Sequence, residues 1–305
     1  MKDSRSPGFY FGAFALALAA AMVTAALLSP GVQSLIAPIK DAPLHRVFTR
    51  IAEVGLFGGT AWLLSRLGLF DRRLMGFGVP PAKFFTRLAG GFVAGLVLMI
   101  AAVLPLFAFD LRELGPHFGS IPALLLSEGP KALMTGLVVA LVEETYFRGA
   151  LQGAMSRRGA SLGVFFAVPA LYAAVHFLGK AVRIPAEQVD WSSGFLVLGS
   201  FFDAFGDPLA IADAFLALYL VGVLLALVRH RLGDIGACIG LHAGFVAIIV
   251  LFRKVSLHTD GSEWSWLVGS FDGLLGLWIA ATTAVACAIA WRWLPRDQNG
   301  LAITK

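Results

Sequence analysis

Two adjacent carboxylates and a guanidinium lie in Glu143-Glu144-Thr145-Tyr146-Phe147-Arg148, within an otherwise apolar stretch. No charged residue precedes them between Ala132 and Val142. Ionisable groups are costly at membrane depth and mark functional sites there. In a helix, Glu144 and Arg148 share one face at a spacing that favours an ion pair, whereas Glu143 points about 100° away. The spacing therefore predicts a structural pair, Glu144 with Arg148, and leaves Glu143 for chemistry.

Two of the six histidines, His176 and His242, are likewise embedded in apolar sequence. Glu143 and His176 are equally far along the chain from a predicted turn at 157–161, so they would face each other at one depth of an antiparallel hairpin. His242 lies ten residues beyond a predicted turn at 232–233, about 15 Å along a helix, which brings it to a similar depth. The remaining histidines are expected to be solvated or interfacial: His45, His117, His230 and His258.

These three side chains support two routes to peptide-bond hydrolysis. Glu143 could take a proton from a water that His176 orients, while His242 donates a hydrogen bond to the oxyanion. Alternatively, Glu143, His176 and His242 could hold zinc, which acidifies its bound water. A non-enzymatic scaffold, or a transporter of cations or protons, could use the same cluster. The sequence gives no convincing sign of the inverted repeats or paired broken helices that many transporters have.

The elements that must position these residues are membrane helices. Hydrophobic residues make up 58% of the 305, charged residues 14%, and mean hydropathy is +0.80. Soluble domains are about 25% charged. We therefore expect a single all-α domain over 1–305, a polytopic bundle with its site inside and toward the cytoplasmic face. The bundle would have about eight spans: 8–29, 51–66, 88–109, 132–148, 161–179, 208–228, 235–252 and 268–291.

The net charge of +5 is distributed as the positive-inside rule requires if both termini are cytoplasmic. No basic cluster lies on a soluble domain, so nucleic-acid binding is not expected. Short loops and Ala- and Gly-rich spans suggest a bacterial inner membrane as the location. Prolines predict irregular structure over 30–50, and the apolar piece 194–202 is too short to span a bilayer. A stripe of small residues, Gly236, Gly240 and Gly244, predicts close helix packing.

At these residues the chain resembles the CPBP intramembrane proteases, also called the CAAX protease and bacteriocin-processing family. The family's Glu-Glu-x-x-x-Arg is met by Glu143, Glu144 and Arg148. Its Phe-x-x-x-His is met with an aromatic substitution, Tyr172-x-x-x-His176. Its His-x-x-x-Asn/Asp is met only by His242, because Val246 occupies the last position. The resemblance covers about 130–250.

The resemblance implies an intramembrane endopeptidase in which Glu143 activates water beside His176 and His242 binds the oxyanion. Glu144 and Arg148 would be a supporting pair. The hydrophobic side chain of Val246 would leave one family donor out of the oxyanion hole. The implied substrate is a membrane-embedded or lipid-modified peptide or protein, and no motif selects among substrates or oligomeric states. A divalent metal such as zinc is compatible with the same residues.

Overall fold

The computed structural model describes residues 5–37, 39, 42–116, 119–157, 162–179 and 182–296. Within them, five helices are long and apolar enough to cross a membrane, and a sixth span results if two helices joined at a 55° bend, Ile121–Ser127 and Gly129–Met155, count as one. The five are α1 (Pro7–Ile36), α2 (Leu44–Arg66), α3 (Pro81–Val103) continued by α4 (Pro105–Ala108), α10 (Pro208–Leu232) and α11 (Gly236–Val255). The protein is a multi-pass membrane protein with an all-α fold, as predicted.

The predicted number of eight spans is not confirmed, although each predicted segment overlaps a helix; the first nine residues of 268–291 precede α12. The two helices that fall short are α8 (Leu162–His176) and α12 (Leu277–Trp293), with 15 and 17 residues. About 20 residues are needed to cross a bilayer perpendicular to its plane. Length, rather than composition, therefore separates these two helices from the others.

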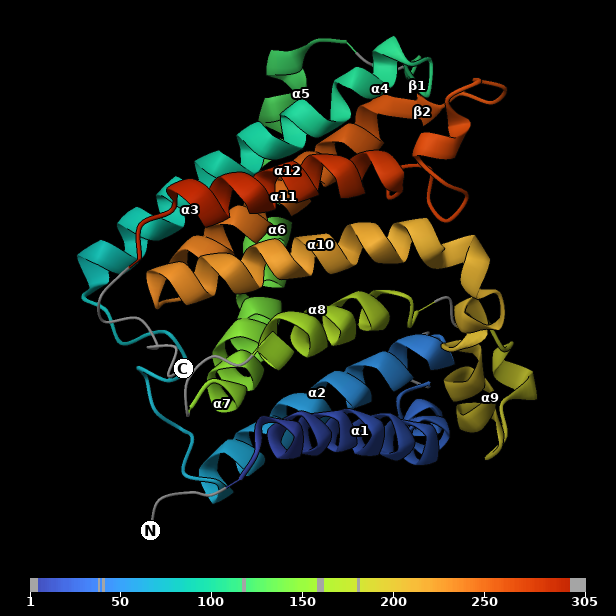
Figure 1. The fold of residues 1–305 in the computed structure, drawn as a ribbon. Helices are drawn as coiled ribbons and strands as arrows, with labels where there is room; N and C mark the ends of the chain where they lie inside the picture. Colours follow the sequence, from blue (N-terminus) through green and yellow to red (C-terminus); the bar gives the residue numbers. More distant parts are fainter. Residues whose placement is uncertain are drawn as a thin grey trace. The chain divides into compact units, whose positions relative to one another are not determined.

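The chain divides into two compact units, and the first comprises Met1–Phe70 and Ala174–Pro208. In this unit 1, α1 and α2 run side by side, and the short helix α9 (Ser193–Ser200) packs against both (Figure 1). Two 3₁₀ turns flank α9: η2 (Ala186–Gln188) and η3 (Asp203–Gly206). Seven buried apolar residues form the core between the three helices: Met22, Ala25, Ala26, Leu44, Phe48, Val197 and Phe201.

Pro30 does not begin an irregular segment, contrary to the prediction for 30–50. It lies inside α1, which continues to Ile36. Because proline has no N–H, the carbonyl of Ala26 has no helical partner at position 30. Gly194 of α9 packs against this carbonyl so closely that a Cβ there would lie 1.9 Å from the oxygen. The helix therefore continues past the hydrogen bond that Pro30 cannot make, and the backbone of α9 packs against the carbonyl left without a helical partner.

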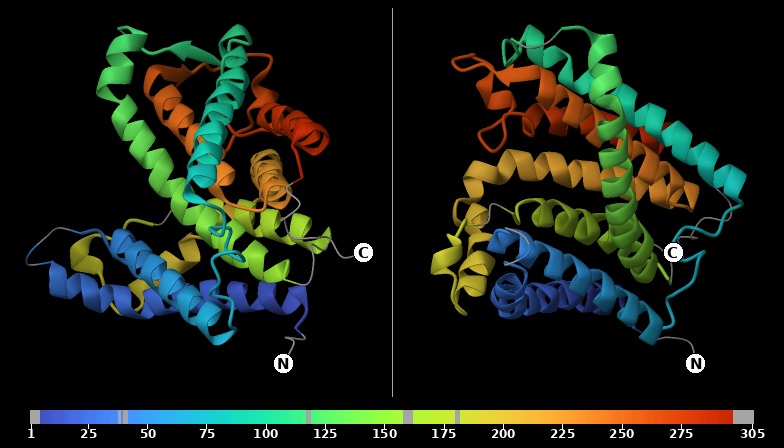
Figure 2. Two further views of the ribbon diagram at one scale, coloured as in Figure 1. Left: turned by 90° about the vertical axis from the view of Figure 1, so that its left-hand side faces the viewer. Right: turned by 180° about the vertical axis from the view of Figure 1, so that it is seen from behind.

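Unit 2 comprises Asp71–Ala173 and Leu209–Lys305. Its inner helices are α10 and α11, which are 61% and 67% buried over their most apolar stretches, against 28% for α3. Figure 2 shows α6 (Gly129–Glu144) crossing α11, which packs most extensively against α3 and α6. The expectation of one domain over the whole chain stays a prediction.

A small antiparallel sheet closes one end of unit 2. Strand β1 (Arg112–Leu114) pairs with β2 (Ser256–His258), with Arg112 opposite His258. The loop that follows contains the 3₁₀ turn η4 (Ser265–Leu267) and receives a hydrogen bond from Arg112 Nη2 to the Gly273 carbonyl at 2.6 Å. The sheet thereby ties the end of α11 to the segment that follows α4.

Glycines set the distance between α3 and α11. A Cβ at Gly240 would lie 2.0 Å from the Leu88 carbonyl oxygen. From the other side, a Cβ at Gly91 would lie 2.3 Å from the Ala237 carbonyl oxygen. The predicted close packing of the glycine stripe is confirmed, and it is reciprocal, since both helices contribute glycines. Such contacts bring helix backbones together where lipid provides no hydrophobic drive.

A matched pair of neighbouring glycines tests this packing. Gly91→Ala forces a methyl group into the α11 backbone, and overpacking of this kind costs about 1–3 kcal/mol. Gly90→Ala places its methyl group in open space and is expected to be neutral or to stabilise by about 0.5 kcal/mol, because alanine is the better helix former. Thermal unfolding in detergent measures both. Equal melting temperatures for the two variants would contradict the proposed contact.

Candidate active site

The Glu143-Glu144 pair lies at the C-terminal end of α6, where the helix changes type. Residues Thr145–Leu151 form a π-helical segment, η1, followed by a last α-helical turn, α7 (Gln152–Met155). The sequence predicted an ordinary helix here, so the π-helix is a finding of the structure. Segments of this kind are rare and occur frequently at functional sites. Arg148 lies in the middle of it.

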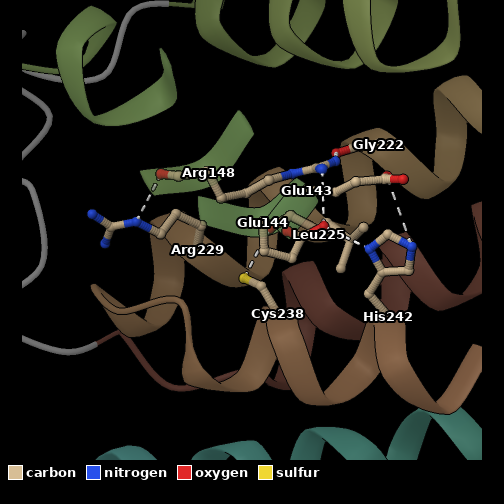
Figure 3. Close-up of polar contacts among 8 residues, drawn as sticks. All are labelled: Glu143, Glu144, Arg148, Gly222, Leu225, Arg229, Cys238 and His242. Carbon is tan, nitrogen blue, oxygen red and sulfur yellow. Dashed lines mark hydrogen bonds and ion pairs between the residues drawn. The ribbon is translucent and has the colours of Figure 1, made fainter. Parts of the chain in front are cut away.

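Glu144 is the centre of a buried polar cluster (Figure 3). Its Oε1 accepts a hydrogen bond from Nη1 of Arg148 at 3.1 Å and lies 2.8 Å from Nδ1 of His242. The side chains of Glu144 and Arg148 are both fully buried. The ion pair expected from the i,i+4 spacing is present, whereas the closer contact of Glu144 with His242 was not predicted. One carboxylate oxygen therefore joins α6, the π-helix and α11.

Glu143 approaches the other nitrogen of the same imidazole. Its Oε2 lies 4.0 Å from Nε2 of His242, and its side chain is 28% exposed, whereas that of Glu144 is inaccessible. Figure 3 shows both carboxylates directed at the ring. The structure thus brings Glu143 and His242 together: the Glu143 side chain is partly exposed, although its Oε2, which faces the ring, is itself buried.

The contact with Glu144 fixes how His242 can act. An ionised carboxylate only accepts hydrogen bonds, so this contact favours the tautomer in which Nδ1 carries the proton. Nε2 then accepts when the ring is neutral and donates only when the ring is an imidazolium. A role for His242 as donor to an oxyanion therefore requires the doubly protonated ring, and Glu143 and Glu144 are the negative charges beside it.

Helices α10 and α8 complete the surroundings of Arg148. Its Nη2 donates to the carbonyl of Gly222 on α10 at 3.1 Å, and the ring of Tyr172 on α8 lies 4.4 Å from its guanidinium carbon. The same tyrosine ring is 6.1 Å from that of His242, edge to face. Tyr172, the aromatic residue of the second motif, therefore packs against two members of the cluster.

Two buried polar residues of the site were missed by sequence reasoning. Arg229 donates through Nε to the Arg148 carbonyl at 3.3 Å and through Nη2 to the Leu74 carbonyl at 2.8 Å. Gln152 donates to the Ala226 carbonyl at 3.0 Å. In the sequence, Arg229 directly follows the predicted span 208–228, where the positive-inside rule places interfacial basic residues. Only its position within the last turn of an apolar helix hinted at burial.

His176 is the last residue of α8 and belongs to unit 1, whereas the other site residues belong to unit 2. Its predicted pairing with Glu143 accordingly stays a prediction. The turn at 157–161 that supported the pairing lies, apart from Arg157, outside the described residues. Tyr172 and His176 are four residues apart on α8 and share one face of that helix.

The cluster offers two donors for a metal ion, Glu143 Oε2 and His242 Nε2. Zinc sites in proteins use at least three protein ligands. Across the described ranges, no three His, Cys, Asp or Glu side chains are grouped so as to hold a metal ion. Zinc held by Glu143, His176 and His242 stays a prediction. Cys238 is buried beside the cluster, where its thiol contacts the Leu225 carbonyl at 3.4 Å.

Residues 126–248 match the model of a protein family described as type II CAAX prenyl endopeptidase Rce1-like. The matched range contains all three motifs, which confirms the predicted family resemblance. The match covers 126–248, which is less than half of the chain, and shows a similarity to this family of endopeptidases. No curated protein and no solved structure matches the chain.

A double-mutant cycle tests the buried ion pair. Arg148→Met leaves Glu144 charged, buried and without its cation, which typically costs about 3–5 kcal/mol of unfolding free energy. Adding Glu144→Gln removes that charge, so the double variant is expected to be more stable than Arg148→Met alone. Chemical denaturation in detergent measures each variant.

The ion pair of Arg253 with Asp272, where the arginine side chain is 50% exposed, provides the control. Arg253→Met should cost less than about 1 kcal/mol, as is usual for exposed pairs. If Glu144→Gln and Arg148→Met destabilise additively, the two side chains are not coupled and the cluster described here is wrong.

Proposed function

We propose that this protein is a CPBP-type intramembrane endopeptidase that hydrolyses a peptide bond with a water activated by Glu143. The observation that carries the proposal is the position of His242 between two carboxylates, one on a fully buried side chain and one on a partly exposed side chain. The cluster lies in the range that matches the Rce1-like family. A site built only for packing would have no need of a partly exposed carboxylate side chain beside a buried charge network.

In the proposed reaction, Glu143 takes a proton from water as the oxygen attacks the carbonyl carbon of the substrate. The carbonyl π electrons move to its oxygen, and the imidazolium of His242 donates from Nε2 to this oxyanion. When the intermediate collapses, the C–N bond breaks and Glu143 returns its proton to the leaving nitrogen. His176 would orient the attacking water, as the family resemblance implies.

Glu144, Arg148 and Tyr172 are positioning residues in this scheme. Glu144 accepts from Nδ1 and so keeps Nε2 of His242 directed toward Glu143. Arg148 holds Glu144 in place and is itself held by the Gly222 carbonyl and the Tyr172 ring. Fixed dipoles and charges of this kind stabilise a transition state without reorganisation during the reaction.

The substrate would be a membrane-embedded or lipid-modified peptide or protein, cleaved toward the cytoplasmic side of the bilayer. A bacterial inner membrane with both termini in the cytoplasm is the proposed location, supported by the distribution of basic residues. No nucleic-acid partner is proposed. A divalent metal, if used, would be held by Glu143, His176 and His242 and would supply Lewis acidity at the same place.

Cleavage of a membrane-embedded reporter by purified protein tests the proposed function. Glu143→Gln and His242→Ala are expected to lower the rate at least about 100-fold, the usual contribution of a general base or an oxyanion donor. His176→Ala is expected to lower it as well. Glu128→Gln is the matched control, since Glu128 precedes α6 at its other end and pairs with Lys131 at 3.5 Å.

The outcomes separate the alternatives. Equal cleavage rates for wild type, Glu143→Gln and His242→Ala would rule out the proposed protease function of this cluster. If a chelator abolishes cleavage and added zinc restores it, the water is activated by a metal bound at the cluster and not by Glu143 alone. Cation or proton uptake into liposomes that disappears in the same variants, without cleavage by any of them, would identify a transporter.

Val246 gives a second test, because it occupies the Asn/Asp position of the family motif one turn beyond His242. Val246→Asn adds an amide donor on the same face of α11. It is expected to raise the cleavage rate about three- to tenfold, which is less than the contribution of an oxyanion-hole donor in an established enzyme. Val246→Leu changes size without adding a donor and should not raise the rate. The proposed geometry fails if leucine and asparagine have the same effect.

A further inference from the structure

Unit 1 contains an open groove of about 730 Å³ between α1 and α2. One wall is a stripe along α1 at four-residue spacing: Thr24, Leu28, Val32 and Ile36. The other wall comes from α2, where Val47, Ile51 and Gly55 lie deeper and Val54 lies at the rim. Leu28 and Val54 are 51% and 74% exposed within this apolar surface. The groove is thus a surface that packing inside the unit leaves uncovered.

The charged residues of the groove lie within the first two turns of α2. Arg46 and Arg50, one turn apart on α2, line it near the point where α1 ends and α2 begins. Both are exposed, and the pair of Arg50 with Glu53 at 2.6 Å is a surface ion pair whose arginine side chain is 79% exposed. Arg183 adds a further positive charge near His45. The α2 N-terminus has no side-chain cap, and its dipole reinforces the positive potential.

The groove has the length of one bilayer leaflet. From Thr24 to Ile36, α1 rises about 18 Å at 1.5 Å per residue. Half of a bilayer core is about 15 Å thick. Arg46 lies near the ends of both helices, where headgroups would lie in a bilayer, and the apolar lining residues extend from there by about the thickness of one leaflet. The groove thus combines positive charge near the headgroups with an apolar surface about as long as an acyl chain. This combination matches the shape and charge of an anionic lipid.

We propose that this groove is a binding site for an anionic phospholipid. An acyl chain lies between the α1 stripe and the apolar residues of α2, and the phosphate is bound by Arg46 and Arg50. With the N-terminus cytoplasmic, the connection between α1 and α2 lies on the outer side, where an arginine near the headgroups attracts an anionic lipid and contributes a several-fold gain in affinity. The proposal concerns unit 1 and does not depend on the function proposed for Glu143 and His242.

Native mass spectrometry of the purified full-length protein tests the site, with phosphatidylglycerol, phosphatidylethanolamine or inorganic phosphate added in detergent. Phosphatidylglycerol is expected to be retained in preference to the other two. Arg46→Gln and Arg50→Gln should each weaken its retention about fivefold. Arg66→Gln is the matched control, because it makes the same charge change at the opposite end of α2, outside the groove.

A groove-filling variant, Val54→Trp, separates the apolar part of the site from its charges. It should reduce retention of phosphatidylglycerol while leaving both arginines in place, and circular dichroism checks that it is folded. Equal retention of the two phospholipids, or equal effects of Arg46→Gln and Arg66→Gln, would overturn the proposal. Binding of inorganic phosphate as strong as that of phosphatidylglycerol, or displacement of lipid by a hydrophobic helical peptide, would overturn it too.

Discussion

The fully buried charge pair of Glu144 and Arg148 is the constraint on which the rest of unit 2 depends. Two ions removed from water are tolerated only if each finds compensating partners. Glu144 receives hydrogen bonds from Arg148 and His242, and Arg148 is held by the Gly222 carbonyl and the Tyr172 ring. These partners come from the π-helix, α11, α10 and α8. Four segments must therefore be in place before the pair can be buried at all.

Close backbone approach makes this arrangement possible. Pro169 and Tyr172 of α8 pack directly against Gly222 of α10. A Cβ at position 222 would lie 3.0 Å from Pro169 and 3.2 Å from Tyr172, so a larger residue would push the two helices apart. Gly136 gives α6 the same freedom against the Ala243 carbonyl, next to His242, where a Cβ would lie 2.5 Å away. Short distances between helix axes allow side chains of ordinary length to meet across three helices. The glycines perform no chemistry, but they determine where the chemical groups are.

Much of this site could be read from the sequence because its signals are local or periodic. Charges in an apolar run identified Glu143, Glu144 and Arg148, and helical spacing predicted the ion pair. Long apolar segments predicted the helices, although their exact lengths, and with them the number of spans, could not be read from composition. The stripe of glycines on α11 correctly indicated close packing.

What the sequence could not provide depends on long-range contacts. The π-helix has no compositional signal, and the contact of Glu144 with His242 joins residues 98 positions apart. Arg229 looked like an interfacial charge because nothing local distinguishes an arginine that faces lipid headgroups from one that faces backbone carbonyls. Pro30 was misjudged because its effect depends on Gly194, far along the chain, which packs against the carbonyl that proline frees.

The bond from Arg229 to the Leu74 carbonyl has a structural consequence. The chain leaves unit 1 at Phe70, so Leu74 is only four residues into unit 2. At the next crossing, Tyr172 is two residues before Ala174, where unit 1 resumes. Two of the three places where the chain passes between the units, 70/71 and 173/174, thus lie within about one helical turn of a residue that contacts Arg148 or its partner Arg229. Arg229, which donates to both the Leu74 carbonyl and the Arg148 carbonyl, thus links the segment that opens unit 2 directly to the π-helix that carries the charge pair.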